Sequence, residues 1–317
     1  MRKAFAQGLI RAAEEDERIV FLTGDLGFRV FDDFQRRFGP RYINVGVAEA
    51  QMMCAAAGLA LEGWRPVAYS IASFATARAF EQIRISITYP RLPVLIVGAG
   101  GGFFYAHAGV THHAGDDLGL MSLLPGMTVV APGSGEELAD LLPQIFRLSG
   151  PCYLRIGGFG EPAYPCAEPA TLERARLLRE GEDLALLTTG TLAGVALQAL
   201  DVLAREGIRP IAYQVHTVKP LDLATLDGLA GRVRTLVIAE EHVPTGGLSA
   251  GVAHWATGRP DAPQVLRVGP PDALALGNPT LGRLRREVGC DVDGLVRACR
   301  QALDPGRRHR AGMAVAG

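Results

Sequence analysis

The feature that most constrains the fold is the alternation of short apolar runs with helical patterns along almost the whole chain. Continuous apolarity bounded by Gly or Pro is typical of parallel strands that are buried on both faces. Helical patterns lie between the runs, for example at 76–86 and 134–148. In the first half of the chain the apolar runs occupy residues 19–25, 65–70, 92–98, 127–132 and 152–157. The alternation predicts an α/β fold of βαβ units with a mainly parallel sheet.

A segment rich in Gly and Pro interrupts this alternation near residue 160. Apolar runs then resume at 183–190, 209–215, 234–241 and 263–269. We therefore expect two doubly wound domains, of which the second is the smaller. The expected divisions are a first domain at 1–160, a linker at 161–180, a second domain at 181–303 and a flexible tail at 304–317.

The composition excludes several classes of protein. A formal net charge of −1 over 317 residues gives no overall attraction to nucleic acid or to an anionic membrane. No apolar run approaches the ~18 residues of a membrane-spanning helix, and the N-terminal residues lack the apolar run of a secretory signal. The five cysteines are scattered and never spaced as CxxC: Cys54, Cys152, Cys166, Cys290 and Cys299. This pattern favours reduced thiols in the cytoplasm and indicates no metal site on this chain.

One carboxylate, Glu49, stands at the head of the otherwise apolar stretch 43–63. A carboxylate in the first turn of a helix is stabilised by the helix dipole, by about 0.3–1 kcal/mol, and needs no further role. A buried acid in a cleft can also have a chemical task. The local pattern leaves both interpretations open.

The residues around Glu49 read GVAEAQMMCAAAGLALEGWRPVAYSIASFATARAFEQIRISITYPRLPVLIVG. This block resembles the pyrimidine-binding domain of transketolases, above all in the C-terminal subunit of split transketolases, whose enzyme consists of two chains. The resemblance continues through HAGVTHHAGDDLGLMSLLPGMTVVAPGSGEEL, HTVKPLD and EEHVPTGGLSAGVAH, and covers about residues 1–300. It implies a pyrimidine-binding domain followed by a transketolase C-terminal-like domain, with thiamine diphosphate as the cofactor.

The resemblance implies roles for four residues near this cofactor. Glu49 matches the acid that hydrogen-bonds N1′ of the pyrimidine ring, and Phe74 matches the aromatic residue that stacks on that ring. Asp25 matches an acidic residue near the cofactor, and Ile71 stands where the family often has a second aromatic residue. Without the resemblance, Phe74 reads as core packing and Asp25 as an ordinary turn residue after a strand.

Three histidines and two arginines are expected on the substrate side. His112 matches a histidine that faces the reacting carbon and oxygen, where an imidazole can donate to an oxygen or relay a proton. His113 stands where the family commonly has glutamine, and His107 is a nearby loop histidine. Arg2 matches an arginine that binds phosphate, and Arg29 lies in a loop that can approach the same place. A surface position is the alternative for each histidine.

Other positions depart from the family. His107 and Ala108 replace a Glu-Asp pair that reads a sugar hydroxyl, while Gly100 and Gly158 replace two phosphate ligands, a histidine and an arginine. We expect the cofactor chemistry to be kept and the donor or acceptor to differ. The aromatic residues 103–105 fit a hydrophobic or carrier-tethered acceptor, and residues of a partner chain are the alternative replacement for the lost ligands.

The chain lacks the GDG motif that precedes the metal and diphosphate site in thiamine enzymes. We therefore expect an N-terminal transketolase-like partner subunit to hold Mg²⁺ and the diphosphate, in an assembly that we take to be α2β2. The expected reaction is transfer of a two-carbon ketol unit from a ketose donor. The alternatives are an E1 beta-type subunit of a 2-oxoacid dehydrogenase, acyl or glycolyl transfer to a lipoyl or carrier-protein thiol, and a non-catalytic scaffold subunit.

Overall fold

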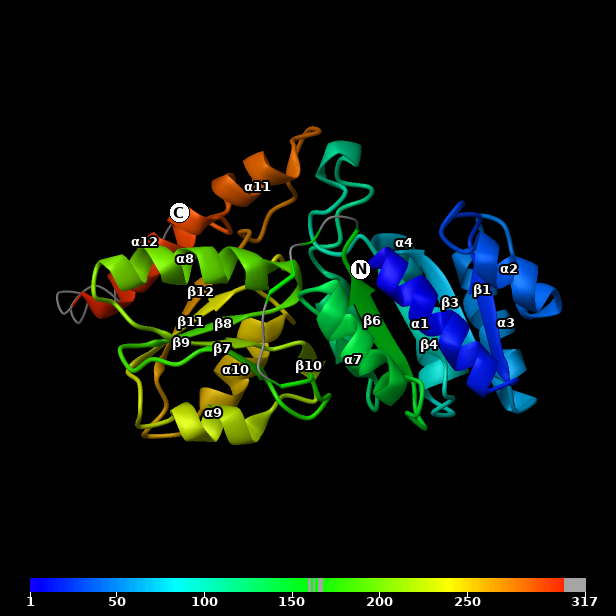
Figure 1. The fold of residues 1–317 in the computed structure, drawn as a ribbon, viewed down its shortest axis with the longest axis horizontal. Coiled ribbons are helices and arrows are strands. Elements are labelled where there is room, and N and C mark those ends of the chain that lie inside the picture. Colours follow the sequence, from blue (N-terminus) through cyan, green and yellow to red (C-terminus); the bar gives the residue numbers. More distant parts are fainter. Residues whose placement is uncertain (159–160, 162, 165–167, 305–317) are drawn as a thin grey trace.

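The computed structural model describes residues 1–158, 161, 163–164 and 168–304. Two α/β units follow one another along the chain, with the first on the right and the second on the left in Figure 1. The tail expected at 304–317 lies outside the described residues apart from Asp304, as does Cys166. Among the helices of the described residues, none is long and apolar enough to cross a membrane.

The first unit is built on a seven-stranded sheet of order β10-β5-β6-β4-β3-β1-β2. Its strands are β1 (Ile19–Thr23), β2 (Tyr42–Asn44), β3 (Arg65–Ile71), β4 (Leu95–Ala99), β5 (Thr128–Val130), β6 (Cys152–Ile156) and β10 (Thr217–Lys219). All neighbouring pairs are parallel except β10 with β5. The expected parallel sheet is confirmed, and the five predicted apolar runs correspond to β1, β3, β4, β5 and β6.

Helices cover both faces of this sheet, which explains the continuous apolarity of its strands. The helices are α1 (Arg2–Glu15), α2 (Asp32–Phe38), α3 (Glu49–Leu61), α4 (Ala72–Thr76), α5 (Phe80–Gln82), α6 (Asp117–Ser122) and α7 (Gly135–Ile145). One core cluster packs α1, α2 and α7 against one face of the sheet. A second cluster packs the helices α3, α4, α5 and α6 against the opposite face. Short turns of 3₁₀ or π-helix are η1 (Gly39–Arg41), η2 (Ala77–Ala79), η3 (Ile83–Thr88), η4 (Ala106–Ala108) and η5 (Gly190–Leu192).

The second unit has a five-stranded sheet of order β12-β11-β8-β9-β7, in which only β7 is antiparallel to its neighbour. The strands are β7 (Arg176–Arg179), β8 (Ala185–Thr188), β9 (Ile211–Gln214), β11 (Thr235–Ala239) and β12 (Gln264–Val268). The helices are α8 (Ala193–Arg205), α9 (Leu223–Leu229), α10 (Leu248–Ala256), α11 (Leu281–Glu287) and α12 (Val292–Leu303). α8 and α12 pack on one face, and α9 and α10 on the other. The strand β7 lies within the segment 161–180 that we expected to be linker.

The two units share structure rather than meeting only at a linker. β10 belongs to the second unit by sequence, yet it extends the first sheet beside β5. Lys219 at its end donates to the carbonyl oxygens of Ser122 and Leu124, at 2.7 and 2.6 Å. No local pattern indicated that β10 would join the first sheet, because a three-residue strand with a distant partner carries no periodic signal.

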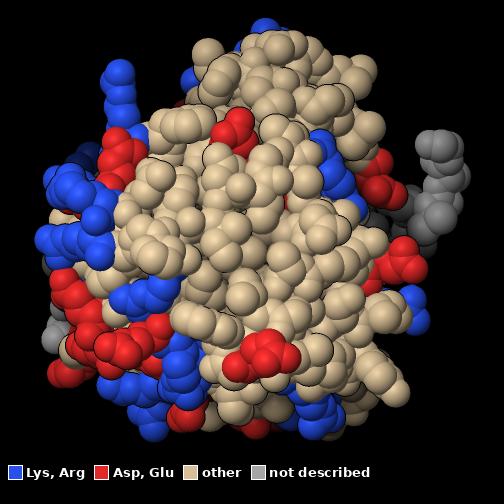
Figure 2. Space-filling model, turned by 90° about the vertical axis from the view of Figure 1, so that its right-hand side faces the viewer, with Lys and Arg blue, Asp and Glu red and all other residues tan. Residues whose placement is uncertain are grey.

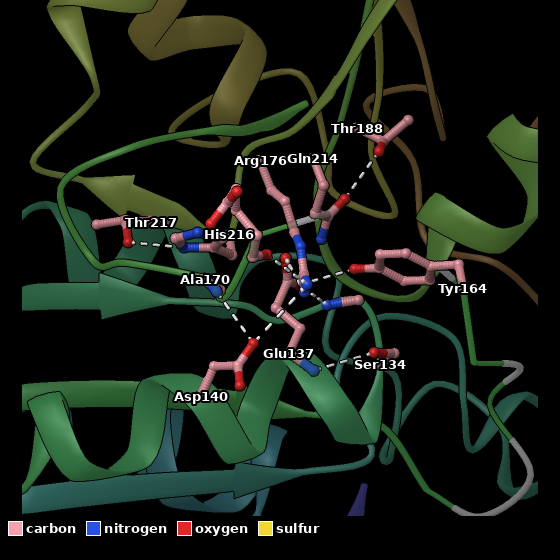
Figure 3. Close-up of polar contacts among 12 residues, drawn as sticks. Ser134, Glu137, Asp140, Tyr164, Ala170, Arg176, Thr188, Gln214, His216 and Thr217 are labelled. Carbon is pink, nitrogen blue, oxygen red and sulfur yellow. Dashed lines mark hydrogen bonds and ion pairs between the residues drawn. The ribbon is translucent and has the colours of Figure 1, made fainter. Parts of the chain in front are cut away.

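A buried carboxylate, Glu137, lies where the two units meet (Figure 3). It accepts hydrogen bonds from the Gly133 amide at 2.6 Å and the Tyr164 hydroxyl at 2.9 Å, and Arg176 lies 3.8 Å away. Burial raises the pKa of Glu137 to about 7. Burial also lowers the pKa of the nearby His216 to about 4.

We expect the Glu137→Gln variant to be more stable than the wild type at pH 8 but not at pH 4.5. In the folded state the pKa of Glu137 is raised from 4.5 to about 7, so the neutral carboxyl is favoured by folding. As the pH rises through 7 this group becomes charged in the folded protein, and its contribution to stability is lost. The full difference corresponds to about 3 kcal/mol in the free energy of unfolding. Because His216 is present in both chains, its opposite pH dependence cancels in the comparison. Urea unfolding at the two pH values, with the exposed neighbour changed in Glu136→Gln as control, tests this; a pH-independent difference contradicts it.

Candidate active site

Glu49 is the first residue of α3, and its side chain is 1% exposed. The helix begins at the carboxyl edge of the parallel sheet, where α/β folds place their ligands. The two carboxylate oxygens have different partners. Oε1 accepts from the hydroxyl of Ser70 in β3 at 2.9 Å, and Oε2 accepts from the guanidinium of Arg78 at 2.8 Å. The acid is thus buried but directed toward a charged side chain.

An aromatic side chain and an imidazole adjoin this ion pair. The Arg78 guanidinium carbon lies 4.4 Å from the ring centroid of Phe74, which is on α4. The His112 ring meets the Phe74 ring edge-on, with centroids 5.1 Å apart. Nδ1 of His112 is 2.8 Å from the Thr111 hydroxyl, which fixes the orientation of the imidazole. Arg78 therefore links Glu49 to Phe74, and Phe74 in turn contacts His112.

The contacts continue from His112 to the start of the chain. The ring of Tyr105 lies 6.0 Å from that of His112, and the Tyr105 hydroxyl accepts a hydrogen bond from Arg2. The Arg2 guanidinium carbon is 5.3 Å from the ring centroid of Tyr105 and 5.6 Å from that of Phe104. A line of side chains thus runs from Glu49 to Arg2, with two aromatic rings holding the arginine.

Two glycines make room for these rings. Gly100 has φ of +70°, and a Cβ atom there would lie 2.2 Å from Cε2 of Tyr105. A Cβ atom at Gly158 would lie 1.7 Å from Cζ of Phe104. Two of the positions that depart from the family pattern, Gly100 and Gly158, are therefore the ones over which Tyr105 and Phe104 pack. Rings and larger side chains exclude one another here.

We expect the Gly158→Ala variant to lose about 1–3 kcal/mol of stability, because the added methyl group overpacks the site against Phe104. Truncating the ring removes the clash, so Phe104→Ala combined with Gly158→Ala should cost less than the sum of the two single changes. Urea unfolding of the four chains measures this coupling. Additive effects, or a Gly158→Ala chain as stable as the wild type, contradict the prediction.

The other loop residues fall outside the line of contacts or at its rim. His113 is turned away, because Nε2 lies 3.1 Å from the Ala106 carbonyl oxygen and its ring packs edge-on against Phe103. Phe103 is itself 4% exposed and belongs to a small core, so only two members of the expected aromatic cluster face Arg2. His107 is exposed, with its ring centroid 6.2 Å from that of Tyr105.

The remaining predicted residues lie around Glu49. Asp25 is exposed with φ of 56°, and its carboxylate accepts from the Asn44 amide at 2.9 Å. Its neighbour Gly24 is close enough that an added Cβ atom would lie 3.4 Å from Glu49 Oε1. Ile71 is half-buried at the end of β3. Arg29 is exposed in the loop before α2, where its amide donates to Asp32.

The second unit supports the loop that carries the histidines. Glu241 accepts from the backbone amide of Phe103 at 3.4 Å and forms an ion pair with Arg285. Leu284 of α11 packs into the Phe103 core, and Asn278 donates to the His107 carbonyl at 2.9 Å. Glu241, at the start of the EEHVPTGGLSAGVAH block, therefore helps to hold the loop.

Arg78 is the residue that sequence reasoning missed. Its spacing of four residues from Phe74 was the available signal, since such residues lie on the same helical face. Its contact with Glu49 spans 29 positions and was not visible in any local pattern. Among the described residues, no group of three or more His, Cys, Asp or Glu side chains is arranged to hold a metal ion.

Comparison with known proteins decides the family. Residues 1–157 match the family model described as the transketolase pyrimidine-binding domain, and residues 173–295 match the transketolase C-terminal domain. The chain is 34% identical over 308 residues to the 6-deoxy-6-sulfo-D-fructose transketolase subunit SqwH of Clostridium sp. (strain MSTE9), covering 96% of this chain and 94% of that protein. This chain belongs to the transketolase family.

Two further relatives show which part of a transketolase-family enzyme this chain corresponds to. A solved structure titled split gene transketolase, inactive beta4 tetramer, has a TM-score of 0.87 and 33% identity, and covers 95% of this chain and 97% of that one. The 1-deoxy-D-xylulose-5-phosphate synthase of Aquifex aeolicus is 34% identical over 310 residues. That match covers 96% of this chain but 48% of the synthase, so this transketolase-family chain spans about half the length of that relative. The resemblance to split transketolase subunits is confirmed.

Proposed function

We propose that this chain is the pyrimidine-binding subunit of a two-chain, thiamine diphosphate-dependent enzyme that transfers a two-carbon ketol unit from a ketose donor. The observation that carries the proposal is the position of the buried Glu49 carboxylate. It contacts Arg78, whose guanidinium lies over the Phe74 ring, and Phe74 in turn contacts His112. Names of the relatives support ketol transfer, since they include transketolase subunits.

The residues present fit the pyrimidine half of the cofactor. A flat, hydrogen-bonding ring needs an aromatic face and a buried acid, and Phe74 and Glu49, which both contact the Arg78 guanidinium, offer these. Bound thiamine diphosphate supplies an electron sink for breaking a carbon–carbon bond beside a ketone. Glu49 would hold a proton at N1′ of the pyrimidine, Phe74 would orient the ring, and His112 would donate to a substrate oxygen.

We assign the diphosphate and Mg²⁺ to a partner subunit with a GDG motif, in an α2β2 assembly. The surface supports a partner. Figure 2 shows the side on which α2 and α3 lie, and its centre is largely free of Lys, Arg, Asp and Glu. Large apolar side chains at both ends of α3 are exposed, with Val47 at 72% and Leu61 at 68%. Such surface is typical of interaction sites.

The substrate end of the site supports a donor or acceptor other than an ordinary sugar phosphate. Gly100 and Gly158 offer no side chain to a phosphate, and Arg2 is packed between Tyr105 and Phe104. The relative SqwH is named for a sulfonated ketose. An acceptor tethered to a carrier protein is also accommodated by this proposal, because the exposed His107 lies at the rim of the site.

The test is a donor comparison on the complex with the partner subunit, using ketose phosphates, a sulfonated ketose and unmodified ketoses. We expect ketol transfer from at least one donor, without strong preference for ordinary sugar phosphates. Strong preference for sugar phosphates contradicts the substrate assignment. Absence of transfer from every ketose contradicts the proposed reaction.

A further inference from the structure

Arg78 makes the two contacts that the proposed function assigns to the aminopyrimidine ring. Its guanidinium is a flat group of hydrogen-bond donors, and it lies 4.4 Å from the ring centroid of Phe74. The same group donates to Oε2 of Glu49 at 2.8 Å. One planar group therefore contacts both the aromatic residue and the acid of the site.

We propose that Arg78 is a movable residue of the cofactor site, which holds the Glu49 and Phe74 contacts until the aminopyrimidine ring displaces it. The inference rests on the proposed function. It adds that Arg78 competes with the aminopyrimidine ring for the contacts with Glu49 and Phe74. Arg78 is then a positioning residue for Glu49, and its departure is a step in cofactor binding.

The two partners of the ion pair differ in their freedom to move. The Glu49 side chain is 1% exposed and is also held by Ser70, whereas the Arg78 side chain is 47% exposed. Arg78 lies in η2, a short turn between α4 and α5, and not within a long helix. The exposed Arg78 side chain can turn its guanidinium into solvent at little cost in free energy. The buried Glu49 carboxylate cannot reach solvent by a change of side-chain conformation. Displacement therefore moves Arg78 and leaves Glu49 in place.

The charge of Glu49 explains why such a residue is useful. A buried carboxylate without a hydrogen-bonding partner is costly. Arg78 is the hydrogen-bonding partner of Glu49 when the site is empty, and the aminopyrimidine ring is its partner when the cofactor is bound. Because only the state with Arg78 turned out accepts the ring, the apparent affinity is reduced by the fraction of chains in that state.

The full chain alone tests the inference, with thiamine as the probe, since thiamine carries the aminopyrimidine ring without the diphosphate. Thiamine titrations by calorimetry or ligand-observed NMR compare the wild type with Arg78→Ala, Arg78→Lys and the control Arg84→Ala, an exposed arginine on η3. We expect Arg78→Ala to bind about three- to tenfold more tightly than the wild type. Arg78→Lys should lie between them, because lysine keeps the charge but not the planar fork. Arg84→Ala should match the wild type.

Adding Glu49→Gln to Arg78→Ala should remove the gain, which shows that the gain acts through the carboxylate. Affinity of Arg78→Ala equal to or below that of the wild type, including no measurable binding by either, overturns the inference. Thermal unfolding establishes that each variant is folded. Thiamine diphosphate binding to the two-subunit complex is measured separately. If the complex binds the cofactor while Arg78→Ala shows no gain, the inference fails and the proposed function stands.

Discussion

Glu49→Gln is expected to lower kcat of the two-subunit enzyme by about 10²–10⁴-fold, the usual contribution of a positioned acid or base. Glutamine keeps one acceptor oxygen for Arg78, and its amide NH2 can donate to the Ser70 hydroxyl in place of the lost oxygen, so the fold and the unfolding temperature should change little. It cannot hold a proton in exchange with N1′. The loss is therefore predicted in turnover rather than in the amount of folded protein.

Steady-state kinetics of the complex measure this effect. Glu62→Gln is a matched control, because Glu62 is exposed at the C-terminal end of the same helix. A Glu49→Gln enzyme within tenfold of the wild type contradicts the assigned role. It would favour the scaffold interpretation, in which this subunit carries no chemistry.

Asp117→Ala is expected to destabilise the chain by about 3–5 kcal/mol, because it leaves a buried arginine without its carboxylate. Asp117 is fully buried, accepts from the Tyr153 hydroxyl at 2.6 Å and lies 3.1 Å from Nε of Arg155. Arg155 in turn donates to the carbonyls of Ala114 and Glu241, at 2.6 and 3.0 Å. Loss of the carboxylate should therefore also loosen the loop that carries His112.

Urea unfolding measures the loss of stability, with the exposed neighbour changed in Asp116→Ala as control. A double variant, Asp117→Ala with Arg155→Met, should recover part of the loss, since an apolar replacement of a buried ion pair is often tolerated. A loss below about 1 kcal/mol for Asp117→Ala, or a double variant less stable than the single one, contradicts this account.

The strands that the sequence predicted best are the ones whose composition is most restricted by burial. β1, β3, β4 and β6 are buried on both faces, and this burial imposes runs of apolar residues. β2 and β7 are edge strands with half-exposed residues, so they carry no comparable pattern. The helical pattern at 76–86 was predicted as one helix but consists of η2, α5 and the π-helix η3. π-helical turns are frequent at functional sites.

The candidate site was predicted mostly through family resemblance. That resemblance pointed to Glu49, Phe74, His112 and Arg2, which the structure connects through Arg78 and Tyr105. It did not indicate the packing of Phe104 over Gly158. That contact depends on a loop conformation that local propensity does not determine. Arg78 shows the same limit, because its importance comes from a tertiary distance.

The most direct measurement is calorimetric binding of thiamine diphosphate with Mg²⁺ to this chain alone and to its complex with a GDG-containing partner. The account predicts tight binding by the complex, at least tenfold weaker binding by the lone chain, and loss of affinity in a Glu49→Ala complex. Equally tight binding by the lone chain would mean that it holds the diphosphate itself. That result would contradict the division of the cofactor site between two subunits.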